Sequence, residues 1–308
     1  MDAVLQIKNL SKSFGNRKVL DNITFNAYRG QVLGFVGPNG AGKTTTIKTV
    51  MGFIARDSGE ILIDGLDVVK NYEKCMGMLG GIVENPQMYN SLSGRVNLEM
   101  YARLHDGVER GRIDEVVRLV GLENRINEPI HKYSLGMKQR LGLAQAILHR
   151  PSILIMDEPT NGLDPAGIRQ MRDIFTYLAR SENTAVIVSS HMLSELEHMC
   201  DRFVVINRGV IVAEDDKRPF IEKLGGVNAY RFTVDDPAGA ADALIALGTE
   251  CKIDVSDGYF DIECARKSLP DVNRFLSAKG FSVYEVQHIT HSLEDAYLAL
   301  LGGGNSIA

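Results

Sequence analysis

One short stretch of the sequence carries the residue types that hold a nucleoside triphosphate. "GPNGAGKTT" (Gly37–Thr45) follows the apolar run "VLGFV" and precedes a helical pattern, which is the setting that a phosphate-binding loop requires. Its glycines let backbone N–H groups turn inward around the β-phosphate. In such a loop Lys43 reaches the β- and γ-phosphates, and the Thr44 hydroxyl is a ligand for Mg²⁺. The candidate binding residues are Gly37, Pro38, Asn39, Gly40, Ala41, Gly42, Lys43, Thr44 and Thr45.

A second stretch, "ILIMDEPTNGLDP", places two neighbouring carboxylates at the end of an apolar run. Asp157 is placed to hold Mg²⁺ through water, and Glu158 can polarise the attacking water as a general base. Neighbouring carboxylates at a strand end can also be solvated loop charges. The phosphate loop in the same chain favours the catalytic interpretation.

A histidine ends a third apolar run, "VIVSSH". A single histidine is usually structural. In a chain that also has a phosphate loop and a pair of carboxylates, a histidine at a strand end is better explained as a contact to the γ-phosphate. The catalytic candidates are therefore Glu158, His191 and Lys43, and the metal candidates include Thr44 and Asp157.

The stretch "YSLGMKQRLGLAQAILHRP" (Tyr133–Pro151) predicts a second seat for an anion. Its periodicity indicates a helix that opens at Ser134, with an apolar face running from Met137 to Leu148. A Ser-Leu-Gly turn at a helix start offers free backbone N–H groups and the positive end of the helix dipole. Ser134 and Gly136 are thus candidates for binding a phosphate other than the one in the first loop.

These motifs require an α/β scaffold to position them. Residues 1–215 alternate short β-rich runs with helical stretches, and the apolar runs "VLGFV" and "ILIM" are typical of parallel strands covered on both faces. The pattern turns helical between Leu92 and His149, which predicts a helical insertion at about residues 92–150. The expected strands are Val4–Asn9, Gln31–Val36, Glu60–Ile63, Ile153–Met156, Ala185–Val188 and Phe203–Ile206.

The character of the sequence changes near residue 219. We expect a first domain over 1–218, a linker over 219–227, an accessory α+β domain over 228–301 and a flexible tail over 302–308. The order of predicted elements in the accessory domain is βαββαβ, which indicates a small ferredoxin-like module. Those elements are Tyr230–Val234, Pro237–Leu247, Glu250–Val255, Tyr259–Glu263, Ser268–Lys279, Phe281–Gln287 and a final helix Ser292–Leu301.

Composition excludes several classes of protein. The chain has 308 residues, a net charge of −5 and 44% hydrophobic residues, which is ordinary for a soluble globular protein and gives no support to general nucleic-acid binding. No apolar run approaches the roughly 20 residues needed to span a bilayer. The four cysteines are scattered without paired spacing, which predicts reduced thiols in the cytoplasm.

In combination and order, the motifs resemble those of the ATP-binding subunits of ABC (ATP-binding cassette) transporters, over about residues 1–215. "GPNGAGKT" resembles the Walker A motif, "ILIMDE" the Walker B motif, "NGLD" with Asp164 the D-loop, His191 the switch histidine and "YSLGMKQR" the signature, usually LSGGQ. The resemblance implies that Phe14 stacks on adenine, although Phe14 alone would be taken for a core residue. It also implies a P-loop NTPase fold with a β-rich N-terminal part and a helical insertion.

The family's architecture gives the second anion seat a purpose. Two cassettes pair head to tail, so the resemblance implies that Ser134 and Gly136 of one subunit bind the γ-phosphate of ATP held by the other. It further implies ATP and Mg²⁺ as ligands, a second ATP-binding cassette as the partner and a separate transmembrane permease. We expect the second cassette to be another copy of this chain, with a related chain as the alternative. The protein would then lie at the cytoplasmic face of the membrane, with no nucleic acid as partner. The alternative is a soluble ABC ATPase that acts on ribosomes or nucleic acid.

Two departures from the family pattern stand out. In the signature, Leu135 and Met137 replace Gly and Gln. In the slot normally held by the Q-loop glutamine, spacing favours Glu84 over the competing Gln87. A carboxylate there is a stronger Mg²⁺ ligand than an amide but cannot donate a hydrogen bond.

Together the two departures resemble the ATPases of bacitracin-resistance and lantibiotic-immunity exporters, which implies export of antimicrobial peptides, drugs or lipid-like substrates. Neutral change at a tolerant position is the other explanation for Glu84. For the accessory domain we expect a role in stabilising the dimer, with ligand sensing as the alternative. His288 and His291, three residues apart, are expected to be surface residues.

Overall fold

The computed structural model describes residues 3–84, 86–191, 196–217, 219–220, 229–246 and 251–289. The chain forms two compact units, Met1–Lys217 and Arg218–Ala308. The predicted helix Ser292–Leu301, the tail 302–308, His291 and most of the predicted linker lie outside the described residues. No helix of the described part is both long enough and apolar enough to cross a membrane.

The first unit is built on a six-stranded sheet in the order β10-β9-β3-β8-β7-β6. All neighbouring pairs are parallel except β9 with β10. Every residue of β3, β7 and β8 is buried, which explains their continuous apolar sequences. The predicted α/β core with parallel strands is confirmed. The strands are β3 (Val32–Val36), β6 (Leu79–Ile82), β7 (Ile153–Asp157), β8 (Ala185–Ser190), β9 (Arg202–Asn207) and β10 (Val210–Asp216).

A second, antiparallel sheet in the order β2-β1-β4-β5 packs against this core. Buried side chains of both sheets form one apolar cluster, in which the rings of Phe25 and Phe35 stack at 5.2 Å. The N–H of Asp21 donates to the carbonyl of Gly209 at 2.8 Å, so β2 also lies beside the β9–β10 turn. The strands are β1 (Ala3–Phe14), β2 (Arg17–Tyr28), β4 (Ser58–Ile63) and β5 (Leu66–Asp67).

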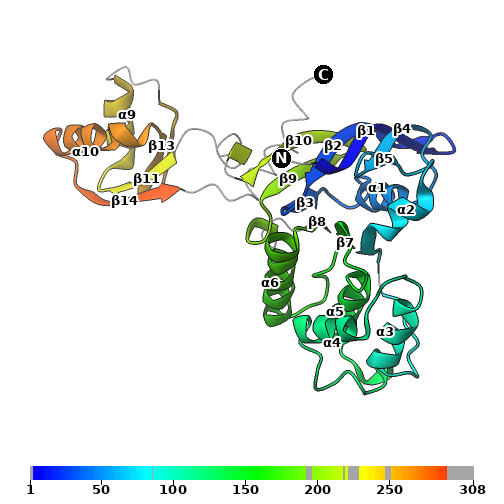
Figure 1. The fold of residues 1–308 in the computed structure, drawn as a ribbon. Helices are drawn as coiled ribbons and strands as arrows, with labels where there is room; N and C mark the ends of the chain where they lie inside the picture. Colours follow the sequence, from blue (N-terminus) through cyan, green and yellow to red (C-terminus); the bar gives the residue numbers. More distant parts are fainter. Residues whose placement is uncertain are drawn as a thin grey trace. The chain divides into compact units, whose positions relative to one another are not determined.

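The helices of the first unit fall into two groups. Helices α3, α4 and α5 lie together as the helical insertion (Figure 1), and α5 also packs against β6, where a Cβ on Gly142 would lie 2.7 Å from Ile82. The helices are α1 (Lys43–Val50), α2 (Tyr72–Gly77), α3 (Gly94–Ala102), α4 (Arg110–Leu119), α5 (Leu135–Ala146) and α6 (Pro165–Glu182), with a 3₁₀ turn at Ile130–Lys132.

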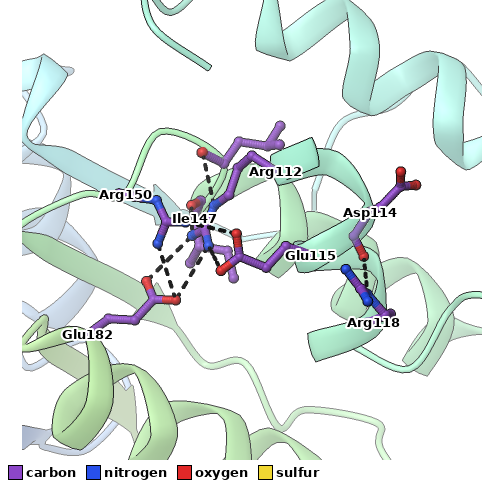
Figure 2. A network of polar contacts seen from close by, with 8 residues as sticks. Arg112, Asp114, Glu115, Arg118, Ile147, Arg150 and Glu182 are labelled. Carbon is purple, nitrogen blue, oxygen red and sulfur yellow. Dashed lines mark hydrogen bonds and ion pairs between the residues drawn. The ribbon is translucent and has the colours of Figure 1, made fainter. Parts of the chain in front are cut away.

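A buried arginine ties the insertion to the rest of the unit (Figure 2). Arg112 on α4 is only 4% exposed, and it donates to the carbonyl of Ile147 at 2.8 Å and to the carboxylate of Glu115 at 2.8 Å. It also reaches Glu182, at the end of α6, at 3.4 Å. Arg150 pairs with Glu115 at 2.8 Å. A buried cation is tolerated only when its donors are paired, as here, and the network fixes the C-terminal end of α5 relative to α4 and α6.

In its described residues, the second unit is an antiparallel sheet in the order β12-β13-β11-β14 with two helices, arranged along the chain as βαββαβ. Its apolar core joins the inward side chains of the sheet, including Phe232 and Phe260, to residues of both helices such as Leu244 and Leu276. The elements are β11 (Ala229–Val234), α9 (Pro237–Ala246), β12 (Ile253–Ser256), β13 (Tyr259–Glu263), α10 (Leu269–Ala278) and β14 (Val283–Ile289).

Some sequence expectations about elements need correction. The sequence pattern does not predict β2, β5, β6 or β10. The β6 sequence "LGGI" contains two glycines, which are poor strand formers, and β10 is a partly exposed outer strand without a clear apolar pattern. The predicted strands Glu250–Val255 and Phe281–Gln287 begin later, at Ile253 and Val283.

Candidate nucleotide-binding site

The phosphate loop lies between the end of β3 and the start of α1, and its backbone requires glycine at three positions. Gly40 and Gly42 have φ angles of 79° and 115°, in the left-handed region that side chains disfavour. A Cβ on Gly37 would lie 2.3 Å from the carbonyl oxygen of Ile206, and one on Gly42 would lie 2.7 Å from Leu20. The loop is therefore packed directly against β9 and β2.

Lys43 places a buried cation inside this loop. Its side chain is 6% exposed, and Nζ donates to the carbonyl of Gly37 at 2.7 Å. The same nitrogen lies 3.4 Å from Oε1 of Glu158. The ammonium group is thus held at the point where the loop meets the end of β7.

Asp157 is fixed by two hydroxyl groups. Thr44 Oγ1, in the first turn of α1, donates to Asp157 Oδ2 at 2.9 Å, and Ser189 Oγ donates to Oδ1 at 2.5 Å. Ser189 also accepts a hydrogen bond from the backbone N–H of Glu158 at 2.9 Å. Ser189 is fully buried and was not among the candidate residues. Its only sequence signal is its position in "VIVSSH", two residues before the candidate histidine.

Glu158 and His191 form an acid–base pair. Nδ1 of His191 lies 2.8 Å from Oε2 of Glu158, while the other carboxylate oxygen faces Lys43. The Glu158 backbone has φ 50°, a conformation that is costly for a residue with a Cβ. Such strain at a strand end directs the carboxylate toward the phosphate loop.

Lys43, Thr44, Glu158 and His191 line one cavity of about 470 Å³. The cavity brings together most of the candidate residues of the phosphate loop with Glu158, His191 and the aromatic Phe14, whose side chain is 49% exposed. Three further lining residues, Arg17, Val19 and Asn161, were not among the candidates. Arg17 and Val19 belong to a hairpin without a binding motif, and Asn161 is the first residue of "NGLD", in which only Asp164 was singled out. The lining residues are Phe14, Arg17, Val19, Pro38, Asn39, Gly40, Gly42, Lys43, Thr44, Thr45, Glu158, Asn161 and His191.

The signature and D-loop candidates do not line this cavity. Ser134 is the N-cap of α5, and its hydroxyl accepts from the N–H of Met137 at 3.2 Å. Asp164 is the N-cap of α6 and accepts from the N–H of Gly167 at 2.8 Å. The side chains of Ser134 and Asp164 therefore cap helices within this chain. Ser134 is exposed at the start of its helix.

Glu84 is held away from the cavity by a lysine. Its carboxylate lies 2.7 Å from Nζ of Lys48, one turn beyond the start of α1, and this hydrogen bond lowers the pKa of Glu84. The Glu84 backbone has φ 65°, and its side chain is 67% exposed. A few residues later, the carbonyl of Gln87 accepts from the Tyr101 hydroxyl at 3.1 Å. The segment after β6 thus contacts both α1 and α3 of the helical insertion.

Comparisons with known proteins identify the family of this chain. A family model described as ABC transporter matches residues 20–161. The chain is 45% identical over 302 residues to the uncharacterized ABC transporter ATP-binding protein YhcH of Bacillus subtilis (strain 168), covering 98% of this chain and 97% of that protein. It is 36% identical over 311 residues to the bacitracin transport ATP-binding protein BcrA of Bacillus licheniformis, covering 99% of each.

Among solved structures, one titled "Structure of ATP binding subunit of ABC transporter" superposes with a TM-score of 0.66 at 29% identity, covering 72% of this chain and 93% of the other. The two sequence relatives match almost the whole chain, so the likeness extends through the second unit as well as the first.

Proposed function

Because this chain belongs to the ABC transporter ATP-binding proteins and is therefore an ATPase coupled to transport, we propose that it is the motor subunit of an exporter, driven by ATP-dependent closure of a head-to-tail dimer. The observation that carries the proposal is the convergence of Lys43, Glu158 and His191 on one cavity, beside the carboxyl ends of the parallel strands β3, β7 and β8. Asp157, the last residue of β7, adjoins the cavity through its hydrogen bond with the lining residue Thr44. The carboxyl ends of parallel strands form a common ligand-binding edge in α/β proteins.

The cavity suits a nucleoside triphosphate in Mg²⁺-bound form. The loop N–H groups and Lys43 bind the phosphates, and the half-exposed ring of Phe14 offers a stacking surface for adenine. Thr44 Oγ1 and Asp157 Oδ2, which lie 2.9 Å apart, are hard oxygen donors of the kind that Mg²⁺ prefers. A bound Mg²⁺ would neutralise charge on the β- and γ-phosphates.

Hydrolysis requires a base and a group that orients it. Glu158 accepts a proton from the attacking water, whose oxygen forms a bond to the γ-phosphorus while the bond to the β-phosphate oxygen breaks and ADP leaves. His191 holds the Glu158 carboxylate through its Nδ1 contact of 2.8 Å. Lys43 keeps a positive charge near the phosphates throughout.

The exposed start of α5 gives the second copy of the chain its role. Ser134 and Gly136 stand at the N-terminus of a 12-residue helix but do not line their own chain's cavity. We assign them to the γ-phosphate of ATP held by the partner copy, because free N–H groups and the helix dipole favour an anion there. Loss of that phosphate on hydrolysis removes the contact and opens the dimer.

A separate permease supplies the membrane path. Large apolar side chains are exposed around α1 and α2, including Phe53 (63%), Val69 (68%) and Tyr72 (48%), and Leu104 after α3 is 74% exposed. Such side chains are expected where a protein partner covers the surface. We propose that the permease docks there and so holds this chain at the cytoplasmic face of the membrane. Bacitracin, named for one relative, indicates antimicrobial peptides as the class of exported substrate.

We assign the second unit to the ferredoxin-like class, because its βαββαβ order and antiparallel sheet match that pattern. Stabilisation of the dimer is its proposed role. The match of the two relatives over this part of the chain shows that they share the second unit.

Co-purification tests the exporter assignment. The tagged chain is expressed together with the genes that neighbour its own gene and is extracted in mild detergent. We expect a hydrophobic membrane protein to co-purify with it at a constant molar ratio. Replacement of Phe53 by Ser should weaken that recovery while leaving ATP turnover of the isolated chain unchanged. Recovery of ribosomes or nucleic acid instead would favour the soluble-ATPase alternative.

Glu84 is expected to link the nucleotide to the permease. When Mg²⁺ and ATP bind, we propose that Glu84 leaves Lys48 and joins Thr44 and Asp157 as an oxygen ligand. Glu84→Ala should therefore weaken Mg²⁺ binding in the presence of ATP by about tenfold, and Glu84→Gln by less, because an amide oxygen still ligates. Mg²⁺ titration of ATP turnover measures both, with Glu60→Gln as an exposed control. Wild-type Mg²⁺ dependence in Glu84→Ala would remove Glu84 from the metal site.

A further inference from the structure

The signature segment and the D-loop contact each other within one chain. Leu135, the first residue of α5, extends its Cδ2 over Gly162: a Cβ built on Gly162 would lie 2.7 Å from that carbon. A Cβ built on Gly136 would likewise lie 3.4 Å from Cδ2 of Leu163. Two side chains and two glycines therefore interlock between the start of α5 and the turn that follows β7.

The contacted turn begins at the proposed catalytic base. The N–H of Asn161 donates to the carbonyl of Glu158 at 3.3 Å, and the N–H of Leu163 donates to the carbonyl of Thr160 at 3.1 Å. Thr160 is 3% exposed, so the turn is anchored on its inner side. Gly162, with φ 75°, is the outer point of the turn and is the point that Leu135 covers.

Leu135 is half-buried by its contact with the turn. Its side chain is 45% exposed, and its Cδ2 is the atom that a Cβ on Gly162 would meet. The absence of a Cβ at Gly162 provides the space that the Leu135 side chain occupies. The two residues are thus complementary in size.

We propose that Leu135 is a positioning residue that sets the D-loop turn and, through it, the backbone of Glu158 in the same chain. This inference rests on the proposed role of Glu158. When the start of α5 moves on binding a phosphate of the partner's ATP, Leu135 transmits that displacement to the turn. The signature motif then acts on hydrolysis in its own chain as well as on binding in the partner.

A double-mutant cycle tests the contact. Leu135→Ala removes the contacting carbons while keeping strong helix propensity, and Gly162→Asn adds a Cβ where Asn tolerates the left-handed backbone. Each single change should lower kcat for ATP about tenfold with KM for ATP within about twofold of wild type, whereas the double variant should recover to within about threefold of wild type. Leu135→Met, which keeps the length of the side chain, should retain wild-type kcat.

Two controls separate the possible failures. Val212→Ala, at a 39% exposed apolar site on β10, should behave as wild type, and thermal unfolding should show that all variants fold. Wild-type kcat in Leu135→Ala, a drop in Leu135→Met equal to that in Leu135→Ala, or additive losses in the double variant would overturn the inference. If Glu158→Gln instead hydrolyses ATP at the wild-type rate, the proposed role of Glu158 as the base fails, whatever Leu135 does.

Discussion

Replacing Glu158 by glutamine is expected to slow ATP turnover by at least about a hundredfold, because general-base catalysis contributes about 10²–10⁴-fold and an amide cannot accept the proton. Glutamine has nearly the same shape as glutamate, so it can still fill the space between Lys43 and His191, although it has no negative charge. ATP binding should therefore persist. A steady-state turnover assay with a fluorescent-nucleotide binding measurement separates the two effects.

The same variant should accumulate as a dimer when Mg-ATP is present. With the γ-phosphate uncleaved, the Ser134 seat of each copy keeps its ligand, and the interface stays closed. Size-exclusion chromatography with light scattering detects this species. Glu60→Gln, at an exposed position on β4, is the matched control and should remain indistinguishable from wild type. Unchanged turnover in Glu158→Gln would exclude Glu158 as the base.

Replacing Lys43 by alanine is expected to abolish the first step, ATP binding. The ammonium is 6% exposed and is held in the loop by the Gly37 carbonyl, so its position is preorganised for phosphates. Charge-assisted hydrogen bonds are worth roughly 1.5–3 kcal/mol each, so losing two of them should raise the Kd for ATP by at least about a hundredfold. Hydrolysis should fall with binding.

Titration with a fluorescent ATP analogue measures this loss directly. Lys8→Ala removes an exposed lysine on β1 and controls for the change in net charge. A Kd within about threefold of wild type for Lys43→Ala would mean that the loop N–H groups alone hold the nucleotide. Lys43→Ala is thus expected to fail at ATP binding, whereas Glu158→Gln is expected to bind ATP and fail at hydrolysis.

The positions of the candidate residues at the strand ends could be predicted because their signals are local. An apolar run marks a strand covered on both faces, and a polar residue at its end must lie at the common edge of the sheet. Asp157 and His191 follow that rule, and the structure places them at the ends of β7 and β8.

Residues that depend on neighbouring strands could not be predicted in this way. Ser189 fixes Asp157 and Glu158 only because β8 lies beside β7, and Arg17 lines the cavity only because the β1–β2 hairpin folds over the phosphate loop. The contact between Leu135 and Gly162 likewise joins segments that are far apart in the sequence. The spacing of residues along the chain does not predict such contacts between distant segments.

Arg112 fixes one end of α5, so a small rotation of the helix produces a large displacement at its other end. The arginine holds the far end of the helix at the Ile147 carbonyl, while Ser134 stands at the opposite end, about 18 Å away along a helix of 12 residues. A tilt of about 5° about the fixed end therefore displaces the Ser134 hydroxyl by about 1.6 Å, roughly half the length of a hydrogen bond. A rotation of a few degrees is thus sufficient to make or release a phosphate contact.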